Sequence, residues 1–107
     1  MTVNDFNEVV KEFINKTETT LIKKQDEYNL GSDRFEFFKR MAKIEDTTPE
    51  RALSHCVTKH ITSFYDMINS GDKFSEQLWM DKLGDIVNYM ILLYGLLKDD
   101  NMFKEKN

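Results

Sequence analysis

The stretch WMDKLGDIVNYMILLYGLL, residues 79–97, decides the fold class of this chain of 107 residues. Between Ile86 and Leu97, Asn88 is the only strongly polar side chain. A helix of this composition is apolar nearly all the way round, so it is expected to lie at the centre of its fold or of its oligomer. Asp81, Asp85 and Asn88 are four and three residues apart, which places them on one stripe of that helix.

Apolar residues at helical spacing predict three further helices before this one. The first pattern runs along Phe6, Val10, Phe13, Thr17 and Leu21. The predicted helices span residues 4–28, 33–44, 48–70 and 75–98.

Capping signals support these boundaries. Thr48 followed by Pro49 is a typical helix start, and Ser75 is placed to cap the last helix. Asp33 with Glu36 resembles a capping box at the start of the second helix. Glycines are expected to end the first and third helices, and these are Gly31 and Gly71.

No segment alternates as a strand does, and the only proline lies at a helix start. The sequence therefore predicts an all-α, four-helix bundle-like single domain over residues 1–107, with an ordered core at 4–98 and a frayed tail at 99–107. The apolar surface of the last helix exceeds what three short neighbours can cover, so a dimer or higher oligomer is expected.

Composition and charge limit the kinds of partner and the compartment expected for the protein. The net charge is −4 with a pI near 5.1, which argues against a nucleic-acid partner because such partners require a basic face. The lone Cys56 fits a reducing, cytoplasmic compartment and lacks the basic neighbours of a nucleophile. The longest apolar run is too short to span a membrane.

Two carboxylates one turn apart repel each other, and a divalent cation removes that conflict. Magnesium prefers oxygen ligands and commonly combines carboxylates with substrate phosphates. Asp81 and Asp85 are therefore candidate metal ligands, and Glu27 or its neighbour Asp26 is a candidate third. Alternatively, Asp81 is a solvated acid favoured by its position near a helix start.

Three other polar residues are candidates for substrate binding. Lys59 lies on a polar stripe and is placed to meet a phosphate, or is solvated like most helical lysines. His60 shares a face with apolar residues, so it is either a ligand contact or a core histidine. Asn88 either hydrogen-bonds a ligand or specifies a helix–helix contact.

The order of several short motifs resembles the all-α nucleoside triphosphate pyrophosphohydrolases of the MazG-like group, in particular small phage-type members. The matching stretches are 24–28 (KQDEY), 33–38 (DRFEFF), 48–53 (TPERAL), 59–66 with Lys59, His60, Ser63 and Asp66, and 79–89 (WMDKLGDIVNY).

This resemblance implies an oligomeric helical bundle that binds Mg²⁺ through carboxylates and splits a nucleoside triphosphate into a monophosphate and pyrophosphate. It implies that Glu27 and Asp85 are catalytic, that Glu27, Asp81 and Asp85 bind the metal, and that Lys24, Lys59, His60 and Asn88 bind the substrate.

The chain departs from the family pattern at two positions. Lys24 replaces the first of two glutamates three residues apart, and Lys82 replaces a glutamate three residues before Asp85.

Two functions therefore stay open. One is a magnesium-dependent nucleotide pyrophosphohydrolase or nucleotide-binding relative, and the other is a non-catalytic helical protein that modulates a host protein.

Overall fold

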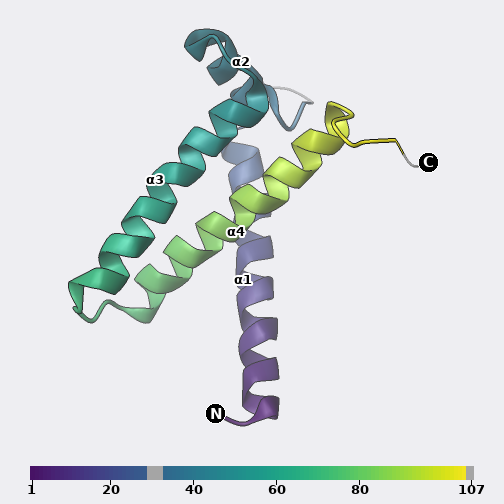
Figure 1. The fold of residues 1–107 in the computed structure, drawn as a ribbon. Helices are drawn as coiled ribbons and strands as arrows, with labels where there is room; N and C mark the ends of the chain where they lie inside the picture. Colours follow the sequence, from purple (N-terminus) through teal and green to yellow (C-terminus); the bar gives the residue numbers. More distant parts are fainter. Residues whose placement is uncertain (29–32, 106–107) are drawn as a thin grey trace.

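A computed structural model describes the backbone of residues 1–28 and 33–105, and the side chains of residues 1–23 and 33–105. It contains the helices α1 (Val3–Tyr28), α2 (Glu36–Glu45), α3 (Pro49–Ser70) and α4 (Glu76–Asp99) (Figure 1). No strand occurs in the described part of the chain. The predicted all-α class is therefore confirmed, and three of the four helices begin within one residue of their predicted starts. Gly31, the predicted end of the first helix, lies outside the described residues.

The helix ends form for the local reasons that the sequence indicates. The Thr48 side chain accepts a hydrogen bond from the backbone N–H of Arg51 at 3.3 Å, and Ser75 accepts one from Leu78 at 3.1 Å. Gly71 ends α3 in the left-handed region, with φ of 72°. These contacts satisfy backbone groups that a helix end leaves without partners.

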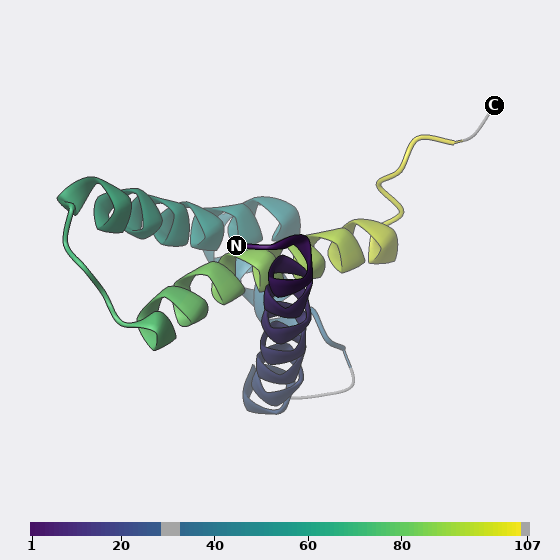
Figure 2. The same cartoon turned by 90° about the horizontal axis from the view of Figure 1, so that it is seen from below.

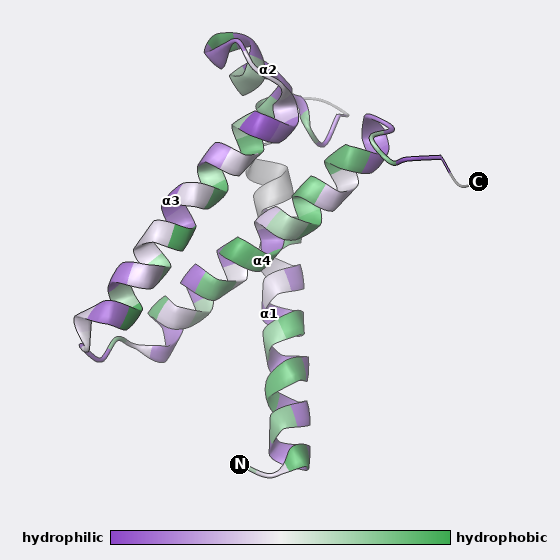
Figure 3. Ribbon diagram, viewed as in Figure 1, coloured by the Kyte–Doolittle hydropathy of each residue, from purple (hydrophilic) through white to green (hydrophobic). Residues whose placement is uncertain are grey.

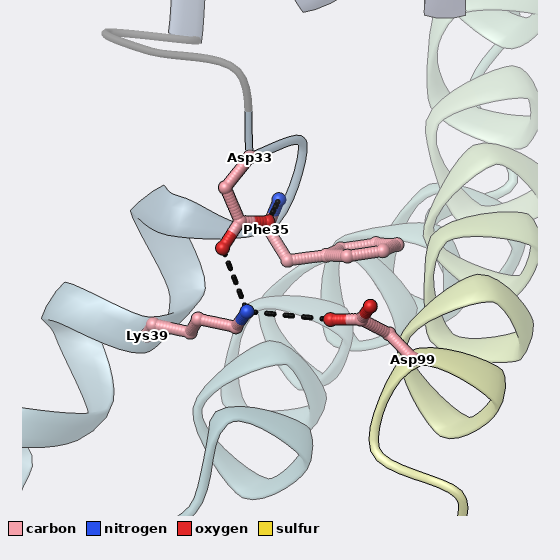
Figure 4. A network of polar contacts seen from close by, with 4 residues as sticks. All are labelled: Asp33, Phe35, Lys39 and Asp99. Carbon is pink, nitrogen blue, oxygen red and sulfur yellow. Dashed lines mark hydrogen bonds and ion pairs between the residues drawn. The ribbon is translucent and has the colours of Figure 1, made fainter.

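The start of α2 differs from the prediction by three residues. Asp33 does not open the helix, because its carboxylate accepts from the Phe35 backbone N–H at 2.9 Å and from Lys39 at 2.6 Å. Lys39 also reaches Asp99 at the end of α4, at 3.3 Å (Figure 4). Asp33 therefore organises the turn before α2, and α2 begins at Glu36.

The apolar core lies where α2, α3 and α4 meet. Phe38, Leu53, Val57 and Leu96 are buried there. Gly95 permits close packing, because a Cβ at this position would lie 3.0 Å from the Phe35 ring. The partly buried residues packed against this core are Phe35, Cys56, Tyr89, Leu92 and Leu93.

Helix α1 crosses α4 instead of running alongside it, and its N-terminal half projects beyond the other helices (Figures 1 and 2). The apolar stripe predicted along α1 is therefore divided. Thr17 is buried and Leu21 half-buried, whereas Phe6 and Val10 are exposed. Figure 3 shows the hydrophobic residues on the projecting half.

One face of α4 is also uncovered, although its composition predicts a central position. Val87, Met90, Ile91 and Tyr94 are between 37% and 56% exposed. In the described residues, no helix combines the length and apolar character needed to cross a membrane. The bundle-like arrangement of the four helices in a single domain, and its assembly into an oligomer, stay predictions.

Candidate cleft between α1 and α4

Helices α1 and α4 touch through small and polar residues. A Cβ on Gly84 would lie 3.1 Å from the Thr17 methyl carbon, so the glycine allows α1 to approach α4 closely at this point. The Thr17 hydroxyl donates within its own helix, to the carbonyls of Phe13 and Ile14 at 3.0 Å each. One turn further along α4, Asn88 donates its Nδ2 to the Thr17 carbonyl at 3.1 Å. This crossing fixes the polar stripe of α4 against α1.

A cleft of about 360 Å³ lies beside the crossing. Asp81, Asp85 and Asn88 all line it, so the three residues that share a stripe in the sequence face one space. Asp81 is exposed and accepts a hydrogen bond from Gln77 at 2.7 Å, whereas Asp85 is half-buried. The rest of the lining is mainly polar: Asn15, Lys16, Thr17, Thr19, Thr20, Gln77, Met80 and Gly84.

A second, smaller cavity of about 170 Å³ lies where all four helices meet. Its described lining is more apolar, and Asp85 and Asn88 belong to it as well as to the cleft. The two spaces therefore adjoin along one short segment of α4. The remaining lining residues are Leu21, Arg34, Phe37, Phe38, Met41, Cys56, Tyr89 and Leu92.

The other predicted site residues are placed differently. Lys59 is exposed on α3, and His60 is half-buried with its ring centroid 5.2 Å from that of Tyr89. Neither of them lines the cleft or the second cavity. The side chains of Lys24, Asp26 and Glu27 lie outside the described residues.

Two of the predicted magnesium ligands, Asp81 and Asp85, line the same cleft. Asp81 and Asp85 fit the preference of Mg²⁺ for carboxylate oxygens supplemented by water and phosphate. Among the residues that the structure describes, no group of three or more His, Cys, Asp or Glu side chains is placed to hold a metal ion. The side chain of the predicted third ligand, Glu27, is not among those described.

Burial shifts the pKa of two side chains that line the second cavity, those of Arg34 and Cys56. Loss of water contact lowers the pKa of Arg34 from its ordinary value. The same effect is the main cause that raises the pKa of the Cys56 thiol. A thiol with a raised pKa is a weak nucleophile at neutral pH, which agrees with the sequence-based prediction for Cys56.

Sequence reasoning gave no site role to Arg34, Phe37 or Thr17. Arg34 and Phe37 lie in and next to the turn that precedes α2, and no helical stripe connects them to α4. Thr17 was recognised only as part of the apolar pattern of α1. Two small residues in the sequence could have indicated the contact between α1 and α4. Thr17 interrupts the apolar stripe of α1, Gly84 interrupts an apolar helix, and small residues often lie where two helices approach closely.

Comparison with known proteins identifies no relative: no family model, no curated protein and no solved structure matches this chain. The resemblance to MazG-like pyrophosphohydrolases therefore rests on the motifs and their order alone.

Proposed function

We propose that the protein binds a nucleoside triphosphate together with Mg²⁺ in the cleft between α1 and α4, as a pyrophosphohydrolase or a nucleotide-binding relative of one. The observation that carries this proposal is the position of Asp81 and Asp85, one turn apart on the wall of a cleft of about 360 Å³. Two carboxylates so placed repel each other, and a cation bound to both of them removes this repulsion.

The surrounding side chains suit a phosphate chain held through a metal ion. Thr20 and Asn15 offer hydrogen-bond donors on the α1 side of the cleft, opposite the acids of α4. The Thr19 hydroxyl already donates to the Asn15 backbone carbonyl at 2.9 Å. Mg²⁺, when bound, neutralises phosphate charge and activates water for attack on phosphorus. Asp85 would hold the ion, and hydrolysis further requires Glu27 to supply a carboxylate.

Thermal melts of the wild type and of Asp85→Asn test this proposal. A nucleoside triphosphate with Mg²⁺ should raise the wild-type melting temperature, because a ligand at 100 times its Kd stabilises the native state by about 2.7 kcal/mol. Asp85→Asn should remain folded and lose this shift. Asp66→Asn, which removes an exposed carboxylate from α3, is the matched control and should keep it.

The opposite pattern would contradict the proposal. If the wild type ignores Mg²⁺ and nucleotides while Asp85→Asn is destabilised, the carboxylate is held by a protein cation, and its loss breaks a buried pair.

We further propose that the protein assembles with itself. The accessible surface is 8268 Å², against about 6,200 Å² for a compact monomer of this mass. The radius of gyration is 16.3 Å, against about 13 Å for a compact domain of this length. The excess of about 2,000 Å² belongs in part to the extended C-terminal segment (Figure 1), and it is larger than the roughly 800 Å² that each partner buries in a standard interface.

The uncovered faces of α1 and α4 are the proposed contact surfaces. Phe6 on α1 is 56% exposed, and Tyr65 on α3 is a matched aromatic at 57%. Light scattering at micromolar concentration should give a multiple of 12.7 kDa for the wild type. Phe6→Asp should reduce the mass to that of a monomer, while Tyr65→Asp should not. A monomeric wild type would overturn self-assembly.

A second candidate function is a non-catalytic helical protein that modulates a host protein. The same uncovered apolar faces favour it, since large exposed apolar patches usually mark protein contacts. A monomer in light scattering that also fails to bind Mg²⁺ and nucleotides would favour this function over the first.

A further inference from the structure

The second cavity is lined by a cation that has no partner in the described part of the chain. The Arg34 side chain is partly buried, and it forms no ion pair or hydrogen bond with any residue that the structure describes. Burial lowers its pKa, and no described carboxylate offsets this effect. A charge taken partly out of water is unfavourable unless an opposite charge compensates for it. The position of Arg34 therefore favours an anion from outside the fold.

The residues on either side of Arg34 are held in place. The preceding Asp33 is not available as a counterion, because it accepts from Lys39 at 2.6 Å and from the Phe35 backbone N–H at 2.9 Å (Figure 4). The Phe35 ring packs against Gly95, where a Cβ would lie 3.0 Å from it. The backbone that carries Arg34 is therefore fixed before a ligand arrives, which lowers the entropy lost on binding.

The other walls of the second cavity are largely apolar. Phe38 is 5% exposed, and its ring meets that of Phe37 edge-on with 5.4 Å between the centroids. Tyr89 and Leu92 line the cavity from α4. An apolar cavity of about 150 Å³ can hold a benzene molecule, so 170 Å³ is enough for an apolar body of that size.

We propose that the second cavity binds a small organic oxyanion, in which a carboxylate or a phosphate pairs with Arg34 and an apolar body contacts the aromatic and aliphatic walls. A guanidinium suits both head groups, because its planar N–H groups reach two oxygens of one anion at once. Asp85 also lines this cavity and repels an anion, so the head group is expected at Arg34 and away from Asp85.

This site goes beyond the proposed function, because it needs neither Mg²⁺ nor a nucleotide. Arg34 lines the second cavity and not the cleft, whereas Asp81 lines the cleft and not the second cavity. Substitution of one of these residues therefore tests one site and leaves the lining of the other intact.

Cys56 allows occupancy of the cavity to be measured directly. It lines the second cavity and is the only cysteine of the chain. A molecule bound in the cavity should slow its reaction with a thiol reagent, and the concentration dependence of the rate gives the affinity. The reaction is followed at alkaline pH, because burial raises the pKa of this thiol.

Four probes separate the head group from the apolar body. Benzoate and phenyl phosphate carry both, benzamide is a neutral analogue of benzoate, and inorganic phosphate lacks the body. We expect benzoate, phenyl phosphate or both to protect Cys56, and the tighter of the two identifies the preferred head group. Benzamide and inorganic phosphate should bind at least about tenfold more weakly, since each lacks one of the two contacts.

Variants of Arg34 test the role of the guanidinium. Arg34→Met should weaken protection by the anions at least about tenfold, which is the loss expected for one charge-assisted hydrogen bond. Arg34→Lys keeps the charge without the planar N–H groups and should retain part of the affinity. Arg40→Met removes an exposed arginine from α2 and should change nothing, as should Asp81→Asn in the cleft. Thermal melts of each variant check that it is folded.

Several results would overturn the proposal. Benzamide that protects Cys56 as well as benzoate does would mean that the cavity takes apolar molecules without a charge requirement. Equal protection in Arg34→Met and the wild type would mean that Arg34 is a solvated surface residue. Protection by a nucleoside triphosphate with Mg²⁺, but by none of the simple anions, would assign the effect to the cleft. Protection by benzoate in a protein that ignores Mg²⁺ and nucleotides would instead keep this site and overturn the proposed function.

Discussion

Helix α4 contacts α2 and α3 on one side and α1 on the other, and the two contacts are formed by different kinds of residue. Against α2 and α3 it packs apolar side chains into a core, with Leu53 and Leu96 fully buried. Against α1 it places Gly84 and Asn88, which meet Thr17 through close approach and a hydrogen bond. The first contact supplies stability, and the second leaves polar groups beside open space. Both cavities adjoin the second contact, because Asp85 and Asn88 line each of them.

The largest expected effect on the free energy of unfolding is that of a substitution in the apolar core. Leu53→Ala should lower the free energy of unfolding by about 2–5 kcal/mol, because it removes a fully buried side chain and leaves a cavity. Urea denaturation followed by circular dichroism measures this change. Ile44→Ala, which truncates an α2 side chain that is 86% exposed, is the control and should stay within about 0.5 kcal/mol of the wild type. Equal losses in the two variants would mean that the core is elsewhere.

A smaller effect is expected at the crossing of α1 and α4. Gly84→Ala gains up to about 1 kcal/mol of helix propensity, but its methyl group meets the buried Thr17 methyl at 3.1 Å. Overpacking typically costs about 1–3 kcal/mol, so we expect a net loss of about 1 kcal/mol.

Thr17→Ser provides the test of that cause. It removes the methyl group and keeps the hydroxyl, so Gly84→Ala should be stabilising when combined with it. If Gly84→Ala costs the same in both backgrounds, the two helices do not meet at Thr17.

The smallest effect is expected for the contacts that tie α2 to the end of α4. The hydrogen bond from Lys39, followed by that from the Phe35 backbone, lowers the pKa of Asp33. A carboxylate with a lowered pKa in the folded state stabilises at neutral pH, and this contribution is lost as the pH falls through its folded-state pKa. Asp33→Asn should therefore be slightly destabilising at pH 7 and neutral in acid.

Salt gives a second measurement of the same contacts. These groups are solvent-exposed, so 1 M NaCl should reduce the difference between Asp33→Asn and the wild type. Glu8→Gln removes one partner of an exposed pair with Lys11 on α1 and serves as the control. An effect of Asp33→Asn that is independent of both pH and salt would mean that the charge of Asp33 does not stabilise this part of the fold.

The sequence by itself determined the helices, since spacing and caps are properties of a few neighbouring residues. Thr48, Ser75 and Gly71 act within one helical turn, so local pattern was sufficient to place them. The predicted helix start at Asp33 is wrong because the Asp33 carboxylate binds Lys39 and the Phe35 backbone N–H, and α2 begins three residues later. The alignment of Asp81, Asp85 and Asn88 also followed from helical periodicity alone.

Only the tertiary structure decided which surfaces these residues face. The stripe on α1 has one pattern throughout, yet Thr17 is buried and Phe6 exposed, because α4 crosses only part of the helix. Arg34 and Asn88 are far apart in the chain and share a cavity only because the segment before α2 packs against α4, where Phe35 lies next to Gly95. Periodicity tells which residues share a helix face, but the neighbour of that face depends on how the whole chain packs.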